Sequence, residues 1–307
     1  QDKLVPATLN YFRKALKVKP LTKLYSPSAT ICNGAIPVPS TYLSPNWIES
    51  DLLIFVTASD EPGQSFLAWA MACVQDSITR RPVIGQINYN IATNRIQVRS
   101  SWSAYQDDLT TSMHELTHVL AFSSGLFDDY IDPSTNTLLP SSSVLVSSWN
   151  LNGKTTTGLV VEPLFSYAKD YFGCSSLYAV PLENQGGSGS LGSHWERRVF
   201  YNEFMTASQI KNTKVTTFTL KLFEASGWYQ PDYSMAEEAF WGKGRGCGFI
   251  DQTCLDGTQT ARFPEFCTGL TSRGCTPTHS HVGYCGASTT TRDSGLDSAF
   301  NYWGDNK

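Results

Sequence analysis

The sequence predicts an α+β protein, and two kinds of pattern carry this prediction. Apolar residues recur at spacings of three and four along residues 109–120, which is typical of a helix with one face in the core. The segments 51–57 and 82–89 are short and apolar, as strands are. The chain of 307 residues, 41% of them hydrophobic, is long enough to bury sizeable cores.

The cysteines indicate how the chain is divided. Five of the eight lie within 39 residues near the end, which predicts a loop-rich unit held by disulfides. An even number of cysteines without close CxxC pairs favours four disulfides and an oxidising compartment over a zinc finger. Eight cysteines allow 105 pairings, so the count alone cannot choose among them. The predicted parts are residues 1–122, 123–233 and 234–307.

Composition limits the partners. A net charge of -4 and an isoelectric point near 5.7 leave no basic patch, so we expect no nucleic-acid partner. No run of about 18 apolar residues occurs, so we expect no transmembrane segment in this chain. We expect a monomer.

Four segments before the central helix can be assigned in order. Residues 5–18 predict a helix, and residues 51–57 predict a buried central strand. Residues 65–74 are interpreted as helical or turning. Residues 81–89 predict a strand, and Pro82 favours either the start of that strand or a sheet edge. The central helix is expected to begin near Asp107 or Asp108.

The central helix carries the sequence His114-Glu115-Leu116-Thr117-His118. Two histidines four residues apart lie on one helix face, so both imidazoles can bind one zinc ion. Glu115 then lies beside the metal, where it can take a proton from a zinc-bound water. The pattern predicts one catalytic Zn²⁺ per chain, with an ordinary helix bearing a histidine pair as the alternative.

A catalytic zinc needs a third protein ligand. The remaining histidines are His194, His279 and His281, and a glutamate from a following helix is the other option. Glu162 precedes a proline and Glu183 lies in a glycine-rich stretch, so neither fits a helix well. His194 follows a run of glycines and is followed eleven residues later by Met205.

Eight segments follow one another along the chain: ICNGAIPVP, SFLAWAMACV, RPVIGQIN, HELTHVLAF, YFGCSSL, QGGSGSLGSHWE, NEFMTAS and AFWGKGRGCGF. In this order they resemble the leishmanolysin family of metzincin zinc peptidases. The resemblance covers most of residues 20–285. It implies that the first part is a twisted mixed sheet carrying the active-site helix, that the second carries a third zinc histidine and a methionine turn, and that the third is cysteine-rich.

The resemblance assigns the site residues. It implies zinc held by His114, His118 and His194, Glu115 as general base, and Met205 in the turn beneath the metal. It also implies disulfides Cys32–Cys73 and Cys174–Cys247, with the remaining four cysteines pairing among themselves. It implies an extracellular location, either secreted or on the cell surface, with a lipid anchor on the full-length form as one variant of the latter.

One residue departs from the family pattern. Metzincins carry glycine three residues after the second zinc histidine, where this chain has Ala121. Alanine at positive φ costs on the order of 1 kcal/mol. We expect either that Ala121 tolerates this conformation or that the helix continues toward Gly125.

If the strand at residues 81–89 is the sheet edge, it suggests how a substrate binds, with an ordinary edge strand covered by a loop as the alternative. Unpaired backbone groups at a sheet edge can accept a peptide as an additional strand. The residues predicted to bind substrate in this way are Ile84, Gly85, Gln86 and Ile87.

The sequence therefore predicts a zinc-dependent endopeptidase acting on extended protein or peptide substrates. The alternative is a zinc-stabilised inactive homologue that serves in adhesion or binding. Glu115 favours the enzyme, because a binding protein has no need of a base.

Overall fold

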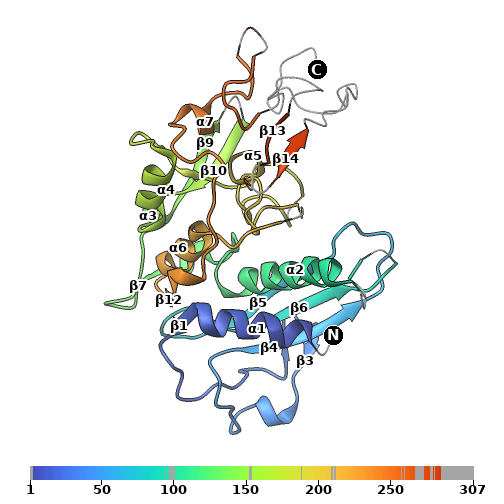
Figure 1. Ribbon diagram of the computed structural model, residues 1–307. Helices are drawn as coiled ribbons and strands as arrows, with labels where there is room; N and C mark the ends of the chain where they lie inside the picture. Colours follow the sequence, from blue (N-terminus) through green and yellow to red (C-terminus); the bar gives the residue numbers. More distant parts are fainter. Residues whose placement is uncertain are drawn as a thin grey trace. The chain divides into compact units, whose positions relative to one another are not determined.

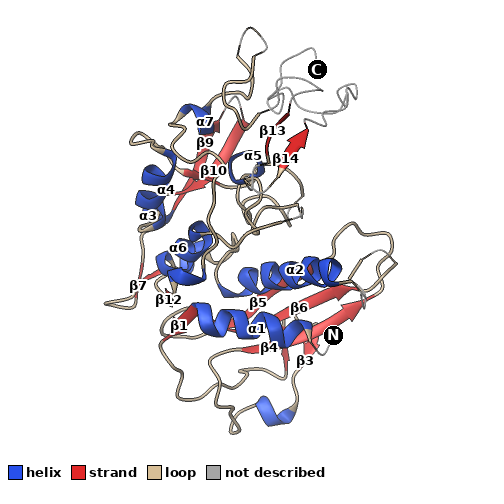
Figure 2. Cartoon of the chain, in the orientation of Figure 1, coloured by secondary structure: helices blue, strands red, loops and turns tan. Residues whose placement is uncertain are grey.

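The computed structural model confirms an α+β protein (Figures 1 and 2). It describes residues 3–284 except 94, 97–100, 152–153, 188, 209, 211, 257, 259, 267–272, 277–278 and 280. The chain divides into two compact units, one formed by residues 1–144 and 219–236 and the other by residues 145–218 and 237–307. The predicted boundaries near residues 122 and 233 stay predictions.

The first unit is built on a three-stranded sheet of order β4-β6-β5, in which β6 runs parallel to β4 and antiparallel to β5. Helix α2 packs on β5 and β6, and α1 packs against α2 on the same side (Figure 1). The elements are α1 (Leu4–Ala15), β1 (Leu16–Val18), β2 (Thr30–Ile31), β3 (Ile36–Pro37), η1 (Ser40–Tyr42), β4 (Leu53–Ser59), β5 (Ala68–Gln75), β6 (Pro82–Asn90), α2 (Trp102–Leu120), η2 (Phe127–Asp129), β7 (Ile131–Asp132), β8 (Thr137–Leu138), α3 (Ser141–Val144), β12 (Tyr229–Pro231) and η3 (Tyr233–Met235).

The second unit contains a three-stranded antiparallel sheet of order β11-β10-β9 and several short helices. Helix α6 (Thr217–Ala225) begins in this unit and continues into the first. The other elements are β9 (Leu145–Leu151), β10 (Lys154–Leu159), α4 (Leu164–Phe172), β11 (Val180–Pro181), α5 (Arg197–Phe200), α7 (Gly248–Asp251), β13 (Arg273–Cys275) and β14 (Val282–Tyr284).

The order of the strands corrects the predicted sheet. β6 is the central strand with all nine residues buried, whereas β4, predicted to be central, is an edge strand with Val56 47% exposed. The backbone of Ile84, Gly85, Gln86 and Ile87 lies between β4 and β5 in the sheet. The prediction that this strand is an edge is therefore wrong, and the substrate-binding role assigned to these four residues loses its basis.

Three other elements differ from their predicted form. Residues 68–75 form the edge strand β5, not a helix or turn. Helix α1 ends at Ala15, and the next three residues form β1, which pairs with β12. Helix α2 begins at Trp102, more than a turn before Asp107, because the Ser101 side chain accepts a hydrogen bond from the Ala104 amide and caps it.

Two disulfides agree with the pairs that the family resemblance implied. Cys32 is bonded to Cys73 in the first unit, and Cys174 to Cys247 in the second. The first joins strand β5 to a core cluster that includes Ile31, Ile36 and Ile84. Cys254 and Cys275 carry free thiols in the described part of the chain, while Cys267 and Cys285 lie outside it.

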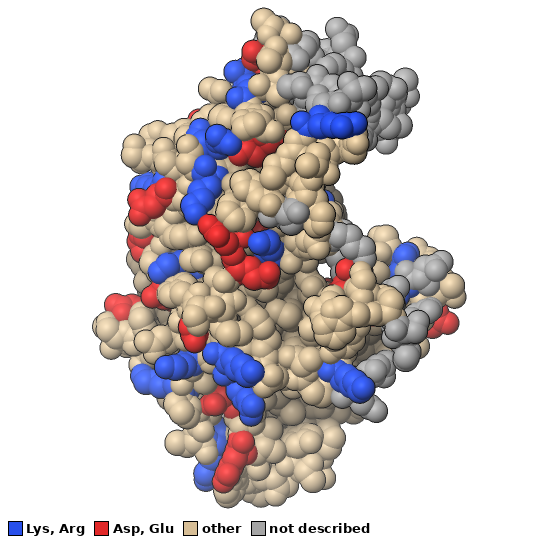
Figure 3. All heavy atoms as spheres, in the orientation of Figure 1, with Lys and Arg blue, Asp and Glu red and all other residues tan. Residues whose placement is uncertain are grey.

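Charges of both signs are interspersed over the face shown in Figure 3. Of the helices that the structure describes, none combines the length and the apolar character needed to cross a bilayer.

Candidate metal centre

Helix α2 fixes the positions of the first two histidines. Leu116 and Leu120 are buried, and the hydroxyl of Tyr89 in β6 donates to Ser112 Oγ at 2.9 Å, so the helix is held on the sheet by packing and by a buried hydrogen bond. His114 and His118 are half-buried on this helix, with ring centroids 4.7 Å apart.

The hydrogen bond of His118 selects one tautomer. Its Nδ1 lies 2.6 Å from the carbonyl oxygen of Phe122. A carbonyl only accepts, so Nδ1 carries the proton and Nε2 presents a lone pair. That Nε2 lies 3.0 Å from His114 Nε2. Two zinc ligands in tetrahedral geometry lie about 3.3 Å apart, so this separation suits a shared metal.

Helix α2 ends without the positive φ considered for Ala121. The residue has φ -157° and ψ -36°, so it does not adopt the left-handed conformation that favours glycine. The amides of Ala121 and Phe122 both donate to the Thr117 carbonyl at 3.0 Å, and the Tyr130 hydroxyl donates to the Ala121 carbonyl at 3.2 Å. The chain therefore turns out of the helix at negative φ. Neither of the two expected outcomes occurs: Ala121 does not adopt a positive φ, and the helix does not continue to Gly125.

Glu115 follows the first histidine and is 6% exposed. Burial raises the pKa of its carboxyl group to about 8. A carboxyl group with such a pKa can hold and release a proton near neutral pH, which general acid–base chemistry requires.

His194 lies in the second unit and is 6% exposed. Its Nδ1 lies 3.0 Å from the carbonyl oxygen of Ser190, so this ring also carries its proton on Nδ1 and presents Nε2. The Glu183 amide donates to the His194 carbonyl at 2.8 Å. Burial lowers the pKa of the imidazole, which favours the neutral form that binds metals.

Met205 is fully buried in the second unit. Its carbonyl accepts the amide of Trp195, the residue after His194, at 3.0 Å. A backbone hydrogen bond thus joins the methionine segment directly to the histidine segment. No bond to a metal is needed for such a role, and thioether sulfur is a poor zinc ligand beside imidazole.

The ligand atoms of His114, His118 and His194 all lie within 4.8 Å of one another. Two of the three rings have Nδ1 held by a backbone carbonyl, the arrangement that orients metal-binding histidines. Three neutral imidazoles suit zinc, which binds three protein ligands at catalytic sites and leaves one position open. The donor set therefore fits a zinc ion.

The other candidate ligands lie elsewhere. His279 is exposed and stacks on Phe240 at 4.3 Å, and His281 is also exposed. Glu183 accepts the amides of Gln185 and Arg197 through its two oxygens. We infer no metal role for these groups.

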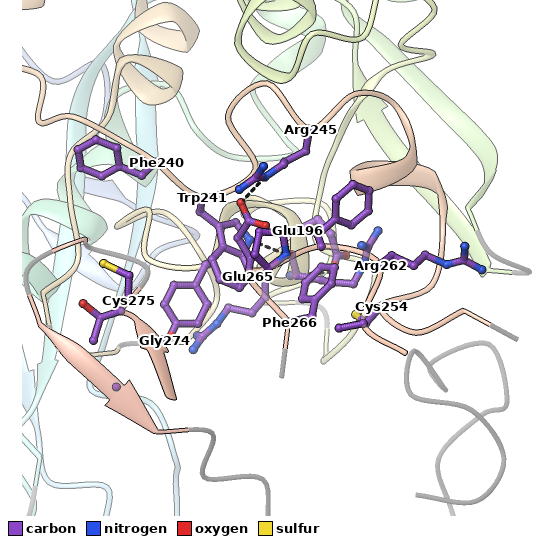
Figure 4. A pocket seen from close by; sticks show the side chains of 18 of the residues that line it. Glu196, Phe240, Trp241, Arg245, Cys254, Arg262, Glu265, Phe266, Gly274 and Cys275 are labelled. Atoms are coloured by element: carbon purple, nitrogen blue, oxygen red, sulfur yellow. Dashed lines mark hydrogen bonds and ion pairs between the residues drawn. The ribbon is translucent and has the colours of Figure 1, made fainter. Parts of the chain in front are cut away.

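A separate pocket of about 1330 Å³ lies within the second unit (Figure 4). Its charged side chains largely bind one another or the backbone. Arg245 Nε donates to Glu265 Oε1 at 2.7 Å, and Arg198 donates to the Phe249 carbonyl at 2.8 Å. Burial and the nearby charge of Glu183 raise the pKa of Glu196 to about 7. The sequence patterns did not indicate this pocket, since its residues come from separate segments.

Comparison with known proteins is consistent with this arrangement. A family model described as leishmanolysin, peptidase family M8, matches residues 2–307. The chain is 31% identical over 243 residues to a leishmanolysin-like peptidase of Caenorhabditis elegans, covering 67% of this chain and 35% of that protein. It is 29% identical over 310 residues to leishmanolysin of Leishmania major, covering 98% of this chain and 47% of that protein.

The chain thus spans between about a third and a half of the length of these relatives. A match along nearly the whole chain shows the family. This protein belongs to the leishmanolysin family, peptidase family M8.

Proposed function

We propose that this chain is the catalytic part of a zinc-dependent endopeptidase. The observation that carries the proposal is the grouping of His114, His118 and His194, with ligand atoms within 4.8 Å of one another. The buried Glu115, the residue that follows His114, supports it. The printed names of the relatives, leishmanolysin and leishmanolysin-like peptidase, support the same class of reaction.

The three histidines would hold the metal through Nε2. A zinc ion bound there supplies Lewis-acid activation of water and of the peptide carbonyl. The Phe122 and Ser190 carbonyls keep two of the rings in the tautomer that such binding needs.

Glu115 would move the protons. As a carboxylate it accepts a proton from the attacking water, and as a carboxylic acid it returns that proton to the leaving amine. Burial alone favours the acid form, since it raises the pKa to about 8. A positive charge beside residue 115 would act against burial and favour the carboxylate.

The sheet edge that would receive substrate is β5. Residues 68–75 pair only with β6 among the described strands, and α2 packs on β5. Cys73 is tied to Cys32, so the stretch from Ala68 to Ala72 is the part available for an extended peptide. Ester replacement of single substrate amides away from the scissile bond tests this mode. KM should rise at every second position, and a uniform effect would contradict strand addition.

The function is tested by hydrolysis of an unfolded protein. We expect Glu115→Gln to bind zinc as wild type does and to lose nearly all hydrolysis, since an amide cannot act as the base. The exposed Glu49→Gln is the matched control and should retain full activity. Equal hydrolysis by wild type, Glu115→Gln and chelator-treated protein would end the enzyme proposal. Zinc binding without hydrolysis by wild type would favour a zinc-stabilised binding protein.

A further inference from the structure

The turn that contains Met205 is built around a buried carboxylate. Glu203 is 1% exposed, and its backbone carbonyl accepts the Thr206 amide at 3.2 Å, which closes a four-residue turn. Its side-chain Oε2 accepts the amide of Met205 at 2.6 Å. Glu203 therefore satisfies the amide at the third position of its own turn, and charge-assisted bonds of this kind are among the stronger ones.

The other carboxylate oxygen binds a second segment. Glu203 Oε1 accepts the Thr216 hydroxyl at 3.3 Å and lies 3.5 Å from the Thr216 amide. The Thr216 hydroxyl in turn accepts the Phe218 amide at the start of α6. The Phe204 amide donates to the Lys214 carbonyl at 2.9 Å and brings the same two segments together. One side chain thus links the turn to the beginning of α6.

The turn is joined to the segment that carries the third histidine. The Met205 carbonyl accepts the Trp195 amide at 3.0 Å, so both backbone polar groups of Met205 are bound, one to Glu203 and one to Trp195. Trp195 has no exposed surface and packs on Phe200 with ring centroids 5.0 Å apart. His194 is the preceding residue, so a shift of the turn would be passed to its imidazole.

We propose that Glu203 is a positioning residue for the metal site. Its carboxylate holds the Met205 turn against Trp195 and thereby sets the position of His194. The inference rests on the proposed function, because it concerns the same zinc ion. Its scope is narrower: it assigns a role to a buried carboxyl group in the second unit that is not among the proposed metal ligands.

The alternative is that Glu203 only stabilises the turn as any buried hydrogen-bonded group does. Two substitutions and a control separate the readings. Glu203→Leu fills a similar volume without an acceptor, while Glu203→Gln keeps one carbonyl oxygen for the Met205 amide and can donate to the Thr216 hydroxyl. Leu164→Ala, at a fully buried position of α4, lowers stability by loss of packing alone.

The measurements are zinc affinity by competition with a chelator and the free energy of unfolding by urea, on the full chain. We expect Glu203→Leu to bind zinc about tenfold more weakly, in the lower range for groups that support metal ligands. Glu203→Gln should stay within about twofold of wild type, and Leu164→Ala should bind zinc normally despite its lower stability.

Two results would overturn the proposal: wild-type zinc affinity in Glu203→Leu, or equal loss in Leu164→Ala. Failure of the wild type to bind zinc would instead contradict the proposed function. The two failures are therefore distinguishable.

Discussion

Gly85 in β6 lies directly against Val119 in α2, the residue after His118. A Cβ atom at residue 85 would collide with Val119 Cγ1 and would lie 3.1 Å from the Met71 carbonyl oxygen. The absence of a side chain therefore lets the metal-binding helix approach the central strand closely. This contact replaces the substrate contact that the sequence had suggested for Gly85.

Gly85→Ala should consequently be destabilising. Overpacking of this kind costs about 1 to 3 kcal/mol, and displacement of α2 should weaken zinc binding as well. Urea unfolding and a zinc competition titration measure the two effects. Gly63→Ala is the control, since no atom lies within 4 Å of a Cβ built there.

A second substitution identifies the cause. Val119→Ala removes the atoms that the new methyl group meets, so Gly85→Ala/Val119→Ala should be more stable than the sum of the two single effects predicts. Strict additivity would show that the cost of Gly85→Ala arises elsewhere.

Patterns confined to one element were predicted well from sequence. The residues around His114 form a helix with Leu116 and Leu120 buried. Local spacing suffices for such features, because they depend on neighbours a few residues away.

The order of the strands was not predictable in the same way. β5 alternates small and large residues, with Ala68, Ala70 and Ala72 on the face toward α2, beside Tyr89, Ile87 and Gly85 of β6. Alanine has a low propensity for strands, so the alternation of small and large residues in this segment was not recognised as a strand pattern. Which strand lies in the centre depends on pairing between distant segments, and no local pattern encodes it.

The third histidine of the metal site could not be identified from local patterns either. His118 and His194 lie far apart in sequence, and spacing alone left His279 and His281 open. Family resemblance pointed to His194, which the structure groups with His114 and His118. Glu203 gave no signal at all, because a single glutamate before a methionine is common in any chain.

Ala121→Gly gives a direct test of the helix end. If residue 121 needed a positive φ, glycine would stabilise the protein. Because φ is -157°, we expect glycine to destabilise it by about 1 kcal/mol through greater freedom of the unfolded chain. The free energy of unfolding of the two proteins decides the matter, and a more stable glycine variant would contradict the observed conformation.

Asp76 should make the stability of the first unit depend on pH in the acid range. Partial burial acts to raise the pKa of this carboxyl group, but hydrogen bonds from the Thr79 amide and hydroxyl and from the Ile78 amide outweigh burial and hold the pKa below 3.8. A lowered pKa in the folded state means that the carboxylate stabilises the fold above the unfolded pKa near 3.9, and that this stabilisation is lost as the pH falls through the folded value.

The stability difference between wild type and Asp76→Asn should therefore be larger at pH 7 than at pH 3. Because the side chain is only partly buried and solvent weakens its interactions, we expect this difference to stay below about 1 kcal/mol. Urea unfolding of zinc-free proteins at both pH values measures it, with the exposed Asp60→Asn as control. If the stability difference between wild type and Asp76→Asn were larger at pH 3 than at pH 7, it would contradict a lowered pKa of Asp76 in the folded state.

Removal of zinc should lower the stability of the wild type, because a ligand that binds only the folded state stabilises it by mass action. The effect is about 2.7 kcal/mol when free zinc is a hundred times its dissociation constant. We expect chelator to lower Tm and added zinc to restore it.

His194→Ala should lose most of this response, whereas His279→Ala, at an exposed ring stacked on Phe240, should keep it. The response should also weaken as the pH falls below about 6.5, since protons compete with zinc for neutral imidazoles. A zinc-dependent rise in Tm that is equal in both variants would place the metal elsewhere and would remove His194 from the site.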